Sequence, residues 1–163
     1  MTVSYVKWGE ATVKLSWERS EALPDQRLIT SVHGFCFYGN QLLLVDLKQR
    51  GWDFPGGHIE EGETPEACFQ REAMEEGYVS GSCELLGFIV VDHTENQFWE
   101  EQGKYPKIGY QVFYRMDIEK LHPFEAEHES ARRILVPIRE VSDNYHDWSD
   151  LYQDILFAAV DLK

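Results

Sequence analysis

Residues 57–79 read GHIEEGETPEACFQREAMEEGYV, a glycine turn followed by carboxylates at helical spacing. Thr64 is placed as the N-cap of a helix, because its hydroxyl can accept a hydrogen bond from a backbone N–H of the first turn. Pro65 follows at the first helical position, where its missing N–H costs nothing. The pattern predicts a helix from Pro65 to about Glu76, with Gly77 as its left-handed cap.

Three carboxylates of this helix are predicted to lie close together. Residues three and four apart share one helix face, so Glu72 lies beside both Glu75 and Glu76. Such a cluster is unfavourable when ionised unless a pKa rises or a divalent cation binds. An all-oxygen set of ligands suits Mg²⁺, or Mn²⁺ as a substitute, better than zinc. The preceding Gly56-Gly57 turn lets the backbone approach a ligand or ion closely.

The order of these positions resembles the Nudix box, the signature of the Nudix hydrolases, which include MutT-like enzymes. The matching residues are Gly57, Glu63, Arg71, Glu72, Glu75 and Glu76. The resemblance implies metal ligands at Gly57, Glu72, Glu75 and Glu76, with Glu75 also a candidate acceptor of a proton from water. It implies that Glu63 and Arg71 complete the catalytic set by orienting the glutamates through charge-assisted hydrogen bonds.

One position departs from the family pattern. Tyr78 stands where the box has glycine, and Gly77 comes one place early. The favoured interpretation is a harmless shift in which Gly77 ends the helix one residue sooner. The alternative is a weakened metal site in a non-catalytic nucleotide-binding module.

The resemblance also implies a reaction, the metal-dependent attack of water on a phosphorus of a nucleoside diphosphate linked to another group. Motifs that we associate with the NADH, coenzyme A and ADP-ribose subfamilies are not evident. Their absence favours a small nucleotide substrate, a nucleoside triphosphate, intact or oxidised, that is cleaved to the monophosphate and pyrophosphate.

The chain is acidic, with 15 basic against 29 acidic residues and a net charge of −14. The average field of such a surface repels a nucleic-acid polymer, whereas a small nucleotide can bind through intervening cations. Three cysteines without a Cys-x-x-Cys pair indicate reduced thiols. With no apolar run long enough for a bilayer and no signal peptide, we expect a cytoplasmic protein without a membrane partner.

The length of 163 residues and the hydrophobic content of 43% predict a single domain over residues 1–163. Strands are predicted at 31–38, 41–47, 52–54, 84–91, 108–117 and 133–136, and a last helix at 148–160. Gly39-Asn40 is a hairpin signal between the first two strands. These elements predict an α+β protein with the Nudix fold, an α/β/α sandwich with a mixed β-sheet. Residues 1–17 receive no element and could support a homodimer.

The box indicates which bond is cleaved, but not the molecule that carries it. The candidate base-stacking aromatics are Phe98, Trp99 and Tyr105 in a long loop predicted at 93–106, and Tyr110 on the next strand. Packing in the core or scaffold is the alternative for each of them. Glu127 or Glu129 is predicted as a further acidic ligand, catalytic base or base-recognition residue, with a solvated loop as the alternative.

Overall fold

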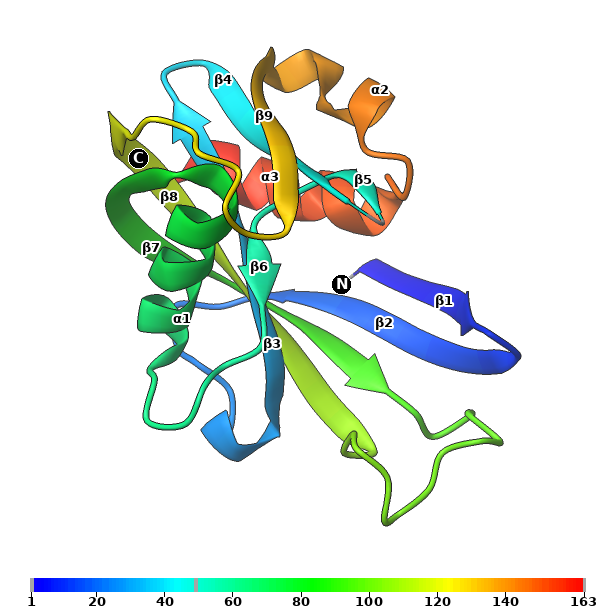
Figure 1. Ribbon diagram of the computed structural model, residues 1–163. Helices are drawn as coiled ribbons and strands as arrows, with labels where there is room; N and C mark the ends of the chain where they lie inside the picture. Colours follow the sequence, from blue (N-terminus) through cyan, green and yellow to red (C-terminus); the bar gives the residue numbers. More distant parts are fainter. Residues whose placement is uncertain (1, 49, 163) are drawn as a thin grey trace.

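A computed structural model describes residues 2–48 and 50–162 (Figure 1). Its strands are β1 (Thr2–Trp8), β2 (Ala11–Arg19), β3 (Ile29–Tyr38), β4 (Gln41–Leu47), β5 (Gly51–Asp53), β6 (Gly56–Gly57), β7 (Val79–Asp92), β8 (Ile108–Leu121) and β9 (Ser130–Pro137). Its α-helices are α1 (Pro65–Glu72), α2 (Val141–Asn144) and α3 (Asp150–Asp161). A π-helical turn, Ala73–Gly77, continues α1. Short 3-10 turns lie at Gln26–Leu28 and Ile138–Glu140.

The described strands form one mixed sheet in the order β1-β2-β7-β8-β3-β4-β5, with β6 paired to β3 and β9 paired to β4. The β3–β8 pair is parallel, and the other pairs are antiparallel. Successive side chains of β4 point to opposite faces. Leu42 and Leu44 enter the core that contains α3, whereas Leu43 and Val45 enter the core that contains α1. The predicted α+β fold, a mixed sheet between helical layers, is therefore confirmed.

The predicted elements agree with the structure except at their ends. The chain turns at Gly39-Asn40 between β3 and β4, as the hairpin signal predicts. β7 and β8 are each 14 residues long and extend well beyond the predicted 84–91 and 108–117. Helix α3 begins at Asp150, after Ser149 as N-cap, two residues later than predicted. The described helices include none that combines the length and the apolar character required to cross a membrane.

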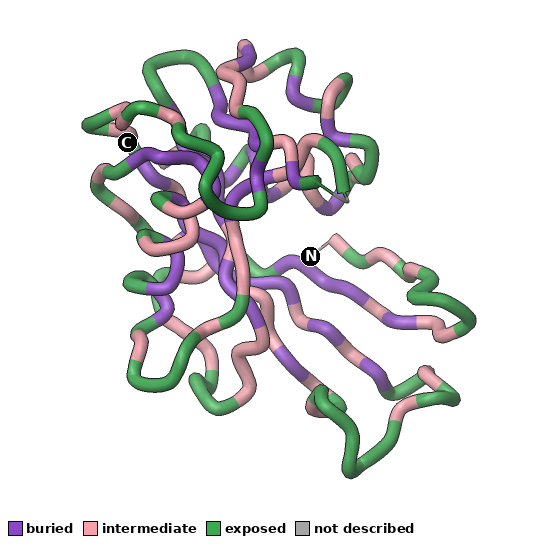
Figure 2. Tube along the Cα trace, in the orientation of Figure 1, coloured by how far each residue is buried: buried purple, intermediate pink, exposed green. Residues whose placement is uncertain are grey.

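The N-terminal hairpin formed by β1 and β2 is an addition to the predicted elements. The residues of β1 are only intermediate or exposed, so this strand adds no fully buried residue to the core. β2 places Val13, Leu15 and Trp17 in the core that contains α3, and it pairs with β7, which is far away in the sequence. The hairpin projects beside the loop of residues 93–107, and most of that loop is exposed (Figures 1 and 2).

Candidate active site

The glycine turn fixes the carboxylate-bearing helix to the sheet. β6 pairs with β3, which places Gly56 opposite His33 and Gly57 opposite Val32. A Cβ on Gly56 would collide with the His33 ring, and a Cβ on Gly57 would collide with the Glu72 carboxylate. Glycine therefore allows a close approach between this main chain and the Glu72 side chain.

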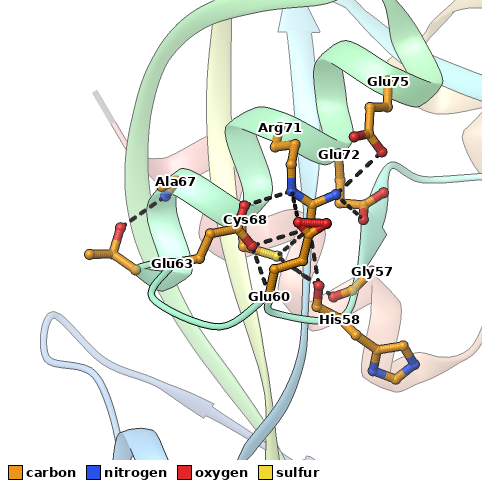
Figure 3. Close-up of polar contacts among 10 residues, drawn as sticks. Gly57, His58, Glu60, Glu63, Ala67, Cys68, Arg71, Glu72 and Glu75 are labelled. Carbon is orange, nitrogen blue, oxygen red and sulfur yellow. Dashed lines mark hydrogen bonds and ion pairs between the residues drawn. The ribbon is translucent and has the colours of Figure 1, made fainter.

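Arg71 lies at the centre of the charged cluster (Figure 3). Its Nε donates a hydrogen bond to Glu63 at 2.6 Å, and one terminal nitrogen donates to Glu72 at 3.0 Å and to Glu75 at 3.3 Å. The other terminal nitrogen donates to the His58 carbonyl at 3.2 Å and to Glu63 at 3.1 Å. The Arg71–Glu63 hydrogen bond raises the pKa of Arg71 and lowers that of Glu63. The contacts suit an orienting residue, and that role remains a prediction.

Glu76 is a buried carboxylate at the end of this cluster, with 3% of its surface exposed. Its Oε1 accepts a hydrogen bond of 2.9 Å from the Gly56 N–H. Burial raises the pKa of Glu76 to about 8, and burial likewise raises the pKa of Glu72. Two carboxylates with this resistance to ionisation are stabilised in their charged form by a nearby cation.

The donor set fits a hard divalent cation, because it consists of carboxylate oxygens that lie partly out of water. Within residues 2–48 and 50–162, however, no three Asp, Glu, His or Cys side chains already converge as a metal site. Arg71 holds Glu72 and Glu75, while the Gly56 N–H holds Glu76. Each of these hydrogen bonds uses one carboxylate oxygen, so the second oxygen of Glu72, Glu75 and Glu76 can contact a cation once the side chains converge.

The prediction that Gly77 is the left-handed cap is wrong. The left-handed residue is Tyr78, with φ 54° and ψ 44°, and its N–H donates to the Met74 carbonyl at 3.0 Å. The extra residue is accommodated by the π-helical turn Ala73–Gly77. Gly77 serves a different purpose, because a Cβ there would lie 2.6 Å from Leu43 Cδ2 on β4. Tyrosine thus occupies the conformation that glycine adopts without strain.

Contacts of the Tyr78 side chain offset the strain of its backbone. Its ring packs edge-on against Phe124, with centroids 5.0 Å apart. Its hydroxyl accepts a hydrogen bond from the Glu127 N–H at 2.9 Å. Next to it, the Ser130 hydroxyl donates to the Glu76 carbonyl at 2.6 Å. The end of the carboxylate helix is therefore attached to the loop of residues 122–129.

A cavity of about 560 Å³, here called the carboxylate cavity, opens beside this cluster. The residues that line it and bear on its chemistry are Arg50, Asp53, Gly57, Arg71, Glu72, Gln111, Glu129, Tyr145 and Tyr152. Glu129 thus faces the same space as Glu72. Glu127 does not line the cavity and is exposed, so the structure separates the two acidic candidates of this loop.

Other residues that line the carboxylate cavity have a different character. Burial lowers the pKa of His33 to about 4, so that its ring is neutral at pH 7. The Ser31 hydroxyl lies 2.7 Å from His33 Nε2. Burial also raises the pKa of Asp53 and of Tyr152. Arg50 is exposed at the rim, where its guanidinium can meet an anion.

Three of the predicted aromatic residues line neither the carboxylate cavity nor a second, smaller cavity beside it. Phe98 is 60% exposed. Trp99 donates from Nε1 to the Tyr105 carbonyl at 3.0 Å, and Lys107 lies over its ring. Tyr110 packs edge-on against Phe88 at 5.2 Å, in agreement with the alternative of scaffold packing. Of the four candidates, Tyr105 alone lines the smaller cavity.

Several residues that line these cavities are not among the residues predicted from the sequence, and they include Trp8, Arg50 and Gln111. Trp8 belongs to a hairpin that the apolar pattern does not reveal. Gln111 is visible in the sequence only as part of an alternating strand. Arg50 carries a usable signal, because it is a basic residue shortly before the glycine turn in an acidic chain.

Comparison with known proteins agrees with the fold and the motif. A profile of the NUDIX domain family matches residues 28–155, which is most of the chain. No curated protein matches the sequence. The matched region contains the entire carboxylate cluster and begins after the N-terminal hairpin.

Solved structures of the same fold are distant in sequence. A mutant of the Bacillus subtilis pyrophosphohydrolase BsRppH, known from its crystal structure, is 23% identical, with a TM-score of 0.70, over 97% of this chain and 96% of that one. The NUDIX domain of Shewanella oneidensis NrtR, solved with ADP ribose, is 19% identical, with a TM-score of 0.59, over 83% and 88%. A MutT structure from a study of Aliivibrio salmonicida and Vibrio cholerae is 16% identical, with a TM-score of 0.57, over 84% and 100%.

Proposed function

The chain belongs to the NUDIX domain family, and from that premise we propose a metal-dependent hydrolase that cleaves the pyrophosphate linkage of a nucleoside diphosphate derivative. The proposed substrate is a nucleoside triphosphate, intact or oxidised, which is converted to the monophosphate and pyrophosphate. One observation carries the proposal. Gly56, Arg71 and Glu72 line a cavity of about 560 Å³, which is large enough for a small ligand, and hydrogen bonds connect Glu75 to Arg71 and buried Glu76 to Gly56.

Glu72, Glu75 and Glu76 are the side chains that would hold Mg²⁺ or Mn²⁺, together with the Gly57 main chain. A bound divalent ion supplies neutralising charge at the phosphate oxygens and lowers the pKa of the attacking water. Arg71, which donates to both Glu72 and Glu75, holds these ligands in place while Glu63 fixes the guanidinium. Glu60 also lies 3.6 Å from Arg71 and adds charge to the same network.

The remaining groups of the cavity act on the water and on the phosphates. Water attacks the α-phosphorus, the anhydride P–O bond to the β-phosphate breaks, and the leaving pyrophosphate keeps the bonding electrons. The proton of the water passes to a carboxylate, for which Glu75 and Glu129 are the candidates. Arg50, an exposed residue that lines the cavity, is the group that we assign to a phosphate of the substrate.

A substrate panel tests this proposal. Nucleoside triphosphates, nucleotide sugars and dinucleotides are incubated with Mg²⁺ or Mn²⁺ and wild type, Glu75→Gln or Glu76→Gln protein. We expect turnover of a nucleotide by wild type and a strong loss in both variants. Glu66→Gln is the matched control, because Glu66 lies in the first turn of the same helix but is not among the hydrogen-bond partners of Arg71, whereas Glu75 bonds to Arg71 and Glu76 bonds to Gly56. The proposal fails if nothing is consumed, or if turnover is insensitive to both substitutions.

A second candidate function is a non-catalytic nucleotide-binding module. Two observations favour it, the tyrosine in the left-handed cap and the absence of a preassembled ligand cluster among residues 2–48 and 50–162. The NUDIX domain of NrtR was solved with ADP ribose, so nucleotide binding by such a domain has a structural precedent. This candidate predicts saturable nucleotide binding without consumption of the nucleotide.

A further inference from the structure

The smaller cavity, of about 270 Å³, adjoins the carboxylate cavity and is here called the aromatic cavity. Ser31, His58 and Gln111 line both of them. A ligand with phosphates beside Glu72 can therefore extend past these three residues into the aromatic cavity. The smaller volume suits one ring system rather than a whole nucleotide.

Rings from three parts of the chain form the walls of the aromatic cavity. Trp8 comes from the end of β1, His93 follows β7, and Tyr105 lies near the end of the long loop. The Trp8 and His93 rings are adjacent, with centroids 5.9 Å apart. A hydrogen bond of 2.9 Å between Asn96 Nδ2 and His93 Nδ1 fixes the His93 ring. Three rings thus line the cavity and offer stacking partners to a planar ligand ring.

Two of the aromatic residues that line the cavity are partly exposed to solvent. Trp8 is 45% exposed and Tyr105 is 43% exposed. Among the described residues, no acidic side chain lines the aromatic cavity, although the chain has a net charge of −14. An uncharged aromatic group fits this lining better than a phosphate or a cation does, because burial of an unpaired charge is costly.

The junction between the cavities has polar character. Gln111 lines both cavities and a third one, and its amide can both donate and accept hydrogen bonds. The His58 ring, anchored 2.8 Å from the Thr30 carbonyl through Nδ1, stands at the same junction. The spatial order is thus carboxylates, polar junction and aromatic walls, which parallels the phosphates, ribose and base of a nucleotide.

We propose that the aromatic cavity holds the base of the nucleotide, with Trp8 and Tyr105 as stacking walls and Gln111 at the ribose. This inference rests on the proposed function, because it assumes phosphates beside the carboxylates. Trp8 lies outside the matched residues 28–155, so the N-terminal hairpin supplies a part of the site that the family profile does not cover.

Binding measurements with a resistant analogue test the base site apart from catalysis. Calorimetry with Mg²⁺ compares the α,β-methylene analogues of ATP and GTP, which carry a base, with inorganic tripolyphosphate, which carries none. We expect Trp8→Ala and Tyr105→Ala to weaken analogue binding about 5- to 100-fold, in line with stacking on one aromatic side chain. Binding of tripolyphosphate should change less than about 2-fold, because it does not reach the aromatic cavity.

Two comparisons sharpen the test. Phe98→Ala is the matched control, since Phe98 is an exposed aromatic residue of the same loop that lines neither cavity. Trp8 also lines a third cavity with Tyr145 and Asp147, whereas Tyr105 lines the aromatic cavity and not that third one, so an effect of Trp8→Ala alone would overturn the proposed location. Thermal melting checks that each variant folds.

The outcomes separate this inference from the proposed function. Base-dependent losses in both variants support the aromatic cavity even if wild type consumes no nucleotide. Equal losses for the analogues and tripolyphosphate, or no loss in either variant, would overturn the base site even if hydrolysis is observed. Wild type that binds neither analogue would also overturn it.

Discussion

The carboxylate cavity and the aromatic cavity differ in how their side chains are held. Around the carboxylates, Arg71 donates to three glutamates, and a main-chain N–H holds Glu76. Around the aromatic cavity, Trp8 and Tyr105 are open to solvent. We infer that hydrogen bonds hold the carboxylates proposed for catalysis in position before a substrate binds. The aromatic side chains proposed for base recognition, in contrast, are exposed until a ligand covers them.

The largest effect is expected for substitutions of the proposed metal ligands in the carboxylate cluster. Glu76→Gln or Glu72→Gln removes a charge that the cation needs, so we expect kcat to fall by more than the roughly 10- to 100-fold typical of an outer-shell partner. Steady-state hydrolysis at saturating Mg²⁺ measures the loss. A variant that retains full activity would remove its residue from the metal site.

Arg71→Ala should follow, with a loss of roughly 10- to 100-fold in activity or metal affinity, because the glutamates lose their common donor. Arg71→Lys is the informative partner, since lysine keeps the charge but cannot bridge several carboxylates through a fixed fork. We expect it to recover little. The measurement is the Mg²⁺ dependence of turnover, and full recovery by lysine would show that charge alone matters.

Tyr78 connects the end of the carboxylate-bearing helix to the loop of residues 122–129, which carries Glu129. Tyr78→Gly relieves the left-handed strain but removes the ring from Phe124 and the acceptor of the Glu127 N–H. We expect the Mg²⁺ concentration for half-maximal turnover to rise about 2- to 10-fold, the equivalent of roughly 1 kcal/mol. Tyr78→Phe keeps the ring and should show the smaller change. An unchanged Mg²⁺ dependence in Tyr78→Gly, with a shifted melting temperature, would indicate a structural role only.

The smallest effect concerns stability without metal. The pKa of Glu76 is raised by burial to about 8 in the folded protein, above its ordinary value of 4.5. Its contribution to stability is thus present below pH 4.5 and is lost as the pH rises toward 8. We expect the melting temperature of metal-free wild type to fall by a few degrees over this window, beyond any fall in Glu76→Gln. Parallel curves for the two proteins would contradict the burial cost.

The helix that carries the glutamates was largely predictable from the sequence, because its signals lie close together in the chain. The N-cap at Thr64, whose hydroxyl accepts from the Ala67 N–H at 3.1 Å, and the spacing of the glutamates depend on residues close in the chain. The cap at Tyr78 could not be predicted in this way. It depends on Leu43, which excludes a side chain at position 77, and on Phe124, which receives the tyrosine ring.

The aromatic cavity was poorly predicted, because its geometry depends on pairing between strands that are far apart in the sequence. An alternation of residue types suggests aromatic candidates but cannot tell that Phe98 faces solvent while Tyr105 lines a cavity. Trp8 reaches the aromatic cavity only because β2 pairs with β7 and brings the hairpin beside His93. Such contacts join segments about 80 residues apart, beyond the reach of local pattern reasoning.

The central claim is that the carboxylate cluster supports hydrolysis, by water, of the nucleotide that the two cavities bind. The most direct measurement follows nucleotide consumption by chromatography in the same Mg²⁺-containing mixture that is used for calorimetric binding of nucleoside triphosphates. We expect wild type to bind the nucleotide and to release the monophosphate and pyrophosphate, and we expect this release to be lost in Glu76→Gln. Saturable binding by wild type without any consumption would contradict the enzymatic claim and identify a binding module.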